Sequence, residues 1–355
     1  MILFSNPYAL ALSAIILAVI LMQSGQYFAQ HWGWIDNPGG RKTHAKPTPL
    51  HGGAAMFVAL LPALIVFALA HPPFWTFVIG STLLVVLGVI DDFQPISARW
   101  RFLAQGLAAG LICIQGGVML QDFGDLLGFG AIHLGFLTAA LVTPITMIGL
   151  INAINMLDGV DGLSATVVLQ FFAWCAGLML WGDMPELWGV ILPCMAITLA
   201  YLAYNFPWRR GNSATLFMGD AGSMLLGLIT VWLAITLSQY PHQVAPPVLF
   251  LWLLAMPLYD TGQVMWQRLC CKQSLFAPDR NHLHHLLQDR GFSARKTVCT
   301  MNGLVFVLAA VGIGLWSAGV AECWMLLLFV VGFVAFLRVL KRMALRFKDD
   351  DLFTP

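Results

Sequence analysis

Residues 54–90 read AAMFVALLPALIVFALAHPPFWTFVIGSTLLVVLGVI and contain no Asp, Glu, Lys or Arg. The stretch holds two apolar runs, 54–70 and 74–90, which a short His-Pro-Pro turn separates. A helix needs about 20 apolar residues to cross the roughly 30 Å hydrocarbon core of a bilayer. Each run is near that length and can span a membrane with some local thinning. The stretch therefore predicts two membrane helices joined by a turn.

Apolar runs of similar length continue along the chain, which is 59% hydrophobic and 10% charged, with a mean hydropathy of +0.80. A soluble domain cannot bury that much apolar surface. The runs are continuous rather than alternating, so they predict helices and not barrel strands. We predict an all-α polytopic membrane helix bundle, a single domain over 1–355, with about eleven transmembrane helices. Their predicted bounds are 8–28, 54–70, 74–90, 102–120, 132–151, 164–181, 187–206, 221–238, 245–266, 297–316 and 320–338.

All 18 Lys and Arg residues fall on one side of this predicted topology. Loops rich in Lys and Arg stay in the cytoplasm, so we predict a periplasmic N-terminus and a cytoplasmic C-terminus. Segment 8–28 lacks the basic start and the cleavage site of a signal peptide and is expected to be the first span. The basic side consists of 29–53, 91–101, 152–163, 207–220, 267–296 and 339–355.

Two adjacent carboxylates, Asp91 and Asp92, follow directly on an apolar run. Neighbouring carboxylates at a membrane border repel each other, so the pair needs a cation or must hold a proton. The alternative is that the pair only marks the end of the span.

The stretch 152–163, NAINMLDGVDGL, places oxygen-bearing side chains at every third position, namely Asn152, Asn155, Asp158 and Asp161. They lie near one face if the preceding helix continues, and the two glycines of the stretch then break the helix. This pattern, without a basic residue, favours a loop that holds a hard cation or a ligand. The alternative is a polar loop in which Asp161 or Ser164 caps the next helix.

The stretch 216–223, LFMGDAGS, places Asp220 at the entry to a predicted span. A helix N-terminus beside glycines suits a phosphate or a metal-bound phosphate. The alternative is that Asp220 only caps the helix. Phe217 could stack on a base, or it could pack against the neighbouring span.

The stretch 276–287, FAPDRNHLHHLL, predicts a cytoplasmic helix over 278–291. On it, His282 and His285 share a face, and His284 points elsewhere. Because the other candidate ligands are oxygen donors, which suit Mg²⁺, these histidines favour phosphate binding or support of the carboxylates over zinc. Arg280 adds a fixed positive charge that suits phosphate oxygens. The alternative is a solvated polar helix.

Two further places carry charge. Asp260 lies within a predicted span, where an acid is a functional candidate by default. The first basic loop carries Arg41, Lys42 and His44, which either enforce topology or meet a phosphate at the membrane surface.

Six stretches, in this order, resemble the polyprenyl-phosphate N-acetylhexosamine-1-phosphate transferases, above all the bacterial undecaprenyl-phosphate N-acetylglucosamine-1-phosphate transferases. The phospho-MurNAc-pentapeptide transferases are more distantly similar. The resemblance covers about residues 30 to 296. The six stretches are DNPGGRKTH, the Asp91-Asp92 pair, NAINMLDGVDGL, FMGDAGS, MPLYD around Asp260, and PDRNHLHH.

The resemblance implies an enzyme of the bacterial inner membrane with its active site at the cytoplasmic face. Undecaprenyl phosphate attacks the sugar-side phosphorus of a UDP-N-acetylhexosamine, UMP leaves, and a lipid-linked sugar diphosphate forms. The implied cofactor is Mg²⁺, with Mn²⁺ as the alternative, because a divalent cation offsets the repulsion between two anionic substrates. The expected partners are these two substrates and no nucleic acid, and a homodimer stays open.

The resemblance also implies residue roles. Asp220 and Asn155 are the implied metal ligands, and Phe217 and Asp161 the implied uracil contacts. The implied catalytic residues are Asp91, Asp92, Asp158, His282, His284 and His285. The further candidates for substrate binding are Arg280, Lys42, Arg41, His44, Asn152 and Asp260.

Asp91 resembles a general base, with Asp92 beside it. A phosphate monoester has a second pKa near 6 and is mostly dianionic at neutral pH, so it scarcely needs a base. Positioning of substrate, or a transient metal contact, is an equal alternative for the pair. The three histidines and Arg280 would hold the diphosphate, and the basic residues of the first loop would receive the lipid phosphate.

The donor sugar and the class of protein each have alternatives. NAINMLDGVDGL and the HLHH spacing favour UDP-N-acetylglucosamine, and fucosamine or quinovosamine derivatives are the alternatives. The loop that reads the sugar is expected within 267–296. A membrane transporter is the rival class, but it would usually place charged groups near the midplane of broken spans. Here they gather at one face.

Replacing Arg280 with Ala should raise the KM for the UDP-sugar and lower kcat, because phosphate charge is held in both the ground state and the transition state. Steady-state kinetics on the purified enzyme measure both constants. An unchanged KM would show that Arg280 is only a topology charge.

Overall fold

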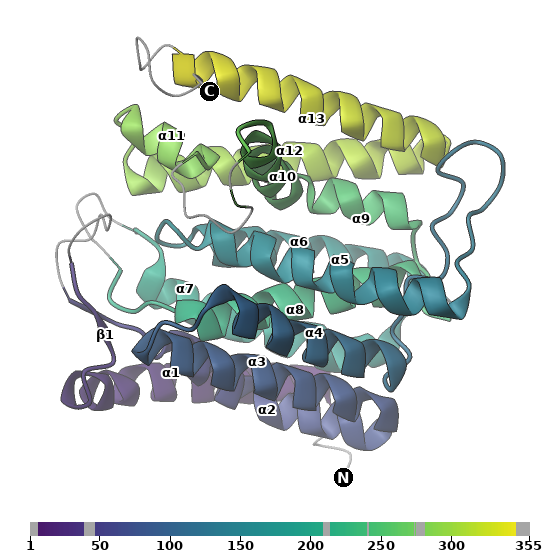
Figure 1. Ribbon diagram of the computed structural model, residues 1–355. Helices are drawn as coiled ribbons and strands as arrows, with labels where there is room; N and C mark the ends of the chain where they lie inside the picture. Colours follow the sequence, from purple (N-terminus) through teal and green to yellow (C-terminus); the bar gives the residue numbers. More distant parts are fainter. Residues whose placement is uncertain are drawn as a thin grey trace. The chain divides into compact units, whose positions relative to one another are not determined.

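The structure of the chain is a computed structural model that describes residues 6–38, 47–208, 214–239, 241–272, 274 and 281–345 (Figure 1). Arg41, Lys42, His44 and Arg280 lie outside the described residues. The chain packs as two compact units. Unit 1 comprises Met1–Gln121 and Leu134–Ala245, and unit 2 comprises Asp122–His133 and Pro246–Pro355. The single domain that the sequence predicts stays a prediction, since compact units need not fold independently.

Helices make up nearly all the regular structure of the described residues. A two-stranded antiparallel pair, β1 (Ile35–Asp36) and β2 (Thr48–Pro49), lies between the first two helices of unit 1. The helices of unit 1 are α1 (Pro7–His31), α2 (Gly52–Ala70), α3 (Trp75–Phe93), α4 (Ala98–Ile114), α5 (Phe136–Leu157), α6 (Leu163–Gly182), α7 (Trp188–Asn205) and α8 (Gly219–Ser238), with short 3₁₀ turns at Pro72–Phe74 and Pro185–Leu187. Those of unit 2 are α9 (Pro247–Leu253), α10 (Ala255–Cys270), α11 (Leu283–Asp289), α12 (Ala294–Ser317) and α13 (Glu322–Leu345).

Every predicted span has its helix, so the all-α membrane bundle is confirmed. Within the described residues, nine helices are long and apolar enough to cross a membrane, and the bent pair of α9 and α10 makes a tenth. The predicted eleventh is α4, whose 17 residues give a length of about 25 Å, the short end of the range for a span. The count of eleven and the sidedness of the termini stay predictions.

The predicted span 245–266 is broken, because α9 and α10 meet at an angle of 80°. Pro257 favours the break, although Pro62, Pro144 and Pro193 lie inside helices that stay continuous. A continuous helix would need an N–H at Pro257 to bond Leu253, and proline has none. In the first turn of a new helix that missing donor costs nothing. Elsewhere in unit 2, the Trp252 indole donates to the Met325 carbonyl at 3.2 Å and thereby joins α9 to α13.

Helix α8 is the centre of unit 1, with 94% of its spanning window buried. It packs against α2, α3 and α5. Two glycines allow the closest approaches: a Cβ at Gly53 would overlap the backbone of Gly222, and a Cβ at Gly88 would overlap the backbone of Ala221. Small residues at such crossings let backbones meet, as is usual in membrane bundles. The start of α8 is therefore held tightly against the ends of α2 and α3.

Replacing Gly88 with Ala should lower the free energy of unfolding by about 1–3 kcal/mol, because α3 and α8 must move apart. The matched control is Gly110→Ala in α4, where a Cβ meets nothing within 4 Å. The control should keep or raise stability, since Ala is the better helix former. Thermal unfolding in detergent measures both, and equal midpoints would contradict the close approach.

Candidate active site

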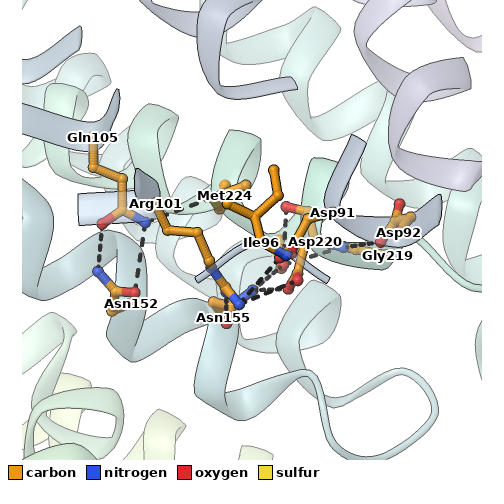
Figure 2. Close-up of polar contacts among 11 residues, drawn as sticks. Asp91, Asp92, Ile96, Arg101, Gln105, Asn152, Asn155, Gly219, Asp220 and Met224 are labelled. Carbon is orange, nitrogen blue, oxygen red and sulfur yellow. Dashed lines mark hydrogen bonds and ion pairs between the residues drawn. The ribbon is translucent and has the colours of Figure 1, made fainter. Parts of the chain in front are cut away.

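Four helix ends meet in unit 1: the last turns of α3 and α5 and the first turns of α4 and α8. Asp91, Arg101, Asn155 and Asp220 come from these four ends and contact one another (Figure 2). Three loops that the sequence predicts to be on one side, 91–101, 152–163 and 207–220, thus converge. We call this group of four residues, together with Asp92, the acidic cluster.

The two adjacent acids have different partners. Asp91 is buried; its Oδ1 accepts a hydrogen bond from the Ile96 N–H, and its Oδ2 lies 3.1 Å from Arg101 Nη1. Asp92 Oδ1 accepts the backbone N–H of Asp220 at 2.9 Å, while its Oδ2 is buried without a hydrogen-bond partner. Asp91 therefore ties α3 to α4, and Asp92 ties α3 to α8. Marking the end of a span does not account for these tertiary contacts.

The start of α8 is built to receive Asp92. Gly219 has a φ of +63°, and a Cβ at that position would overlap the Asp92 carboxylate. The residue at the N-cap of α8 is Met218, and Asp220 lies in the first turn. The alternative that Asp220 is the cap is therefore wrong. Its side chain instead extends to Asn155 and Arg101.

The two asparagines of α5 face different neighbours, although both are helical as expected. Asn155 Nδ2 donates to Asp220 Oδ1 at 2.6 Å and to Ser223 Oγ at 2.7 Å. Asn152 Nδ2 donates to Gln105 Oε1 on α4 at 2.7 Å (Figure 2). Asn155 is thus part of the acidic cluster, whereas Asn152 joins α4 to α5. A role for Asn152 toward substrate stays a prediction.

The two aspartates that follow lie in the turn after α5. Asp158 Oδ1 accepts the Ser164 hydroxyl at 2.7 Å, and Asp161 Oδ2 accepts the Ala214 N–H at 2.9 Å. Burial, together with the carboxylates of Asp220 and Asp161, raises the pKa of Asp158 to about 7. The N-cap of α6 is Gly162. The alternative, in which Asp161 or Ser164 caps this helix, is therefore wrong.

Asn205 is a positioning residue that the sequence did not reveal. It is 2% exposed; its Oδ1 accepts the Gly162 N–H at 2.6 Å, and its Nδ2 donates to the Leu216 carbonyl at 2.8 Å. One buried amide thus joins the loop of Asp161 to the segment of Phe217. The Phe217 ring is partly exposed, and its backbone N–H donates to the Pro49 carbonyl at 2.8 Å.

Arg101 is the second residue missed, because the sequence shows it only as one of the topology charges. It lies in the first turn of α4, and its guanidinium contacts three members of the acidic cluster. Nothing in the local sequence separates Arg101 from Arg99, which is exposed.

In unit 2, Asp260 is 1% exposed and uses both carboxylate oxygens. One oxygen lies 2.7 Å from His282 Nδ1, and the other accepts the Leu283 N–H at 2.7 Å. A buried acid bound in this way orients the imidazole and fixes which ring nitrogen carries hydrogen. Any effect of Asp260 on substrate is therefore expected to pass through His282.

The structure corrects the expected arrangement of the histidines. Within the described residues the helix is shorter than 278–291 and begins at Leu283, so His282 precedes it. The His284 ring does not point elsewhere but stacks on His282 at 5.6 Å and contacts His285 at 4.2 Å between centroids. Burial, reinforced by these neighbours, lowers the pKa of His284 to about 3. A neutral, buried ring attracts phosphate less than an exposed imidazolium.

The acidic cluster fits a divalent cation that substrate helps to hold. Among the described residues, no three His, Cys, Asp or Glu side chains are grouped to hold a metal. Mg²⁺, however, is commonly bound by one or two carboxylates together with phosphates and water. Asp220 and Asn155 are adjacent oxygen-bearing side chains, and Asp92, which binds the Asp220 N–H, has a buried oxygen without a hydrogen-bond partner. These are donors that a hard cation prefers.

Comparison with known proteins places the acidic cluster in a matched segment. The sequence model of glycosyl transferase family 4 matches residues 74–238. The undecaprenyl-phosphate alpha-N-acetylglucosaminyl 1-phosphate transferase of Yersinia pestis is 32% identical over 319 residues, which are 87% of this chain and 85% of the relative. The protein of that name from Escherichia coli K12 is 29% identical, over 88% of this chain and 85% of its own. A probable undecaprenyl-phosphate N-acetylglucosaminyl 1-phosphate transferase of Bacillus subtilis is 29% identical, over 87% of this chain and 84% of the relative.

Replacing Asn205 with Ala should lower the free energy of unfolding by about 2–5 kcal/mol, because a buried N–H and a buried carbonyl lose their partner. The control is Thr198→Ala in the same helix, whose hydroxyl bonds only the Cys194 carbonyl one turn away. It should cost about 1–2 kcal/mol. Equal losses in thermal unfolding would show that Asn205 does not hold the two segments together.

Proposed function

The chain belongs to glycosyl transferase family 4, and from that membership we propose that it transfers N-acetylglucosamine 1-phosphate from UDP-N-acetylglucosamine to undecaprenyl phosphate. UMP is the other product. The observation that carries the proposal is the acidic cluster, where four helix ends of a membrane protein bring oxygen ligands and a guanidinium together. The names of the relatives supply the acceptor and the sugar.

The position of the acidic cluster suits a lipid acceptor. Its members lie at helix ends rather than at midspan, so a phosphate at the membrane surface can reach them while the polyprenyl chain stays in the bilayer. The basic loops of the sequence support a cytoplasmic position for this face, in the bacterial inner membrane. A soluble nucleotide donor is available on that side. A transporter would place its polar groups near midspan.

In the proposed reaction an oxygen of the lipid phosphate attacks the sugar-side phosphorus of the donor, and the bond to the UMP oxygen breaks. Asp220 and Asn155 are the proposed ligands of Mg²⁺ or Mn²⁺. The cation supplies positive charge that offsets the repulsion of the two phosphate groups and stabilises the transition state. The chain itself must bring these groups in line and hold them there.

We propose that Asp91 positions the site rather than removing a proton. Both of its oxygens are already engaged, one by the Ile96 N–H and the other by Arg101. The acceptor phosphate is mostly dianionic at neutral pH and can attack without a base. Asp91 then sets the place of Arg101 and of the turn between α3 and α4.

The uridine is proposed to bind between two segments that Asn205 joins, with Phe217 stacking on the base and Asp161 bonding its edge. The partly exposed Phe217 ring supports this assignment. The histidines of unit 2 stay the candidates for phosphate contacts, with His282 oriented by Asp260. The product would start a lipid-linked surface polysaccharide such as an O-antigen. A homodimer also stays a prediction.

The test is release of UMP by the purified chain with undecaprenyl phosphate, Mg²⁺ and a panel of UDP-sugars. UDP-N-acetylglucosamine should give UMP and a labelled lipid, and both should disappear with EDTA. If only another UDP-N-acetylhexosamine gives a labelled lipid, the proposed donor is wrong but the proposed reaction class stands. A folded protein that releases no UMP with any sugar would refute the proposal.

Replacing Asp220 with Asn should lower turnover by about a hundredfold or more, because the charge that attracts the cation is lost while the size of the side chain is kept. The control is Asp183→Asn, an exposed acid in a loop with a φ of 50°, which Asn tolerates. It should leave turnover unchanged. Near-normal UMP release from folded Asp220→Asn would remove Asp220 from the metal site.

A further inference from the structure

One guanidinium lies against both proposed cation ligands. Arg101 Nη1 is 3.1 Å from Asp91 Oδ2 and 3.5 Å from Asp220 Oδ2, and its Nη2 donates to Asn155 Oδ1 at 3.4 Å (Figure 2). A guanidinium offers five donors in a planar fork, so it can serve all three partners at once. Arg101 thus occupies the side of Asp220 and Asn155 where positive charge is needed.

The same contacts orient the Asn155 amide. Its nitrogen donates to Asp220 Oδ1 at 2.6 Å and to Ser223 Oγ at 2.7 Å, and its oxygen accepts from Arg101. The hydrogen-bond network as a whole assigns this orientation of the amide. The guanidinium therefore lies against two oxygens, Asn155 Oδ1 and Asp220 Oδ2. A cation that took its place would meet both oxygens without a turn of the amide.

We propose that Arg101 is an internal counter-ion that holds Asp220 and Asn155 in a cation-free arrangement, and that a divalent cation binds by displacing it. The inference rests on the proposed function, because it takes the two residues as cation ligands. Arg101 does not leave the cluster when it is displaced. Its shortest contact is with Asp91, which does not share the cation, so Asp91 is where the guanidinium remains.

Access and charge both favour such an exchange. The side chains of Asp220 and Arg101 are 30% and 25% exposed, so a hydrated cation can reach them from solvent. Without any counter-charge, the carboxylates of Asp91, Asp92 and Asp220 would repel one another across short distances. Arg101 lowers that repulsion in the free enzyme, and the same positive charge must weaken cation binding.

The experiment measures Mn²⁺ binding to the full-length protein in detergent by the EPR signal of free Mn²⁺, without substrates. The variant Arg101→Met keeps the length of the side chain and removes its charge. It should bind Mn²⁺ about tenfold more tightly than the unchanged protein, because the partly screened repulsion between the guanidinium and the cation is lost. In EDTA the variant should also unfold at a lower temperature than the unchanged protein, and added Mn²⁺ should raise its unfolding temperature by more. Arg99→Met, at an exposed position on the same helix, should match the unchanged protein in both measurements.

If Arg101→Met does not fold, Arg101→Lys answers the question. A single ammonium keeps the charge but cannot hold two carboxylates and the Asn155 oxygen together, so Mn²⁺ should bind about threefold more tightly. Suppose that the unchanged protein binds Mn²⁺ and releases UMP, but the folded variant binds Mn²⁺ equally well or more weakly. This result overturns the proposed role of Arg101 and leaves the proposed function standing. An unchanged protein that neither binds Mn²⁺ nor releases UMP overturns the proposed function, and this inference with it.

Discussion

The hydrogen bond from the Asp220 N–H to the Asp92 carboxylate is the contact on which the acidic cluster depends. The first N–H groups of a helix have no partner within it, and the helix dipole favours a negative group at that end. Asp92, although it comes from α3, supplies that group to α8. Gly219 lets the carboxylate approach because a side chain there would overlap it. This contact fixes where Asp220 lies, and Asn155 and Arg101 bond to Asp220 at that place.

Charge balance is the second constraint. Three carboxylates lie in one network, and a single guanidinium contacts two of them directly. Such a surplus of negative charge costs stability, which proteins commonly accept at functional sites. The surplus also makes the cluster repel a phosphate unless more positive charge arrives. The proposed divalent cation would supply such charge in a reaction between two anionic substrates.

The helices could be predicted because a continuous apolar run near 20 residues long has few alternatives to a membrane helix. The break between α9 and α10 was not predicted, because Pro257 looks like the prolines that lie inside continuous helices. No local signal indicated which residues contact one another within the site. Asn152 and Asn155 look alike in the sequence, but one faces Gln105 and the other Asp220. Arg101 resembles any basic residue at a membrane border, and Asn205 resembles any polar helix end. Each of these residues has a partner between 43 and 68 positions away, which no local pattern encodes.

At this end of unit 1, some segments are held through the backbone, and other groups are joined by side chains alone. Backbone contacts hold the segment of Phe217, whose N–H bonds Pro49 and whose carbonyl accepts the Gly52 N–H at 3.0 Å. Buried Asn205 adds a second tie. Asp220, Asn155 and Arg101 are by contrast partly exposed, and side-chain atoms alone join them. The proposed displacement of Arg101 by a cation would therefore need only the guanidinium to move and not the helices. In the proposed function, the segment that the backbone holds contacts the nucleotide, and the side chains of the acidic cluster contact the cation.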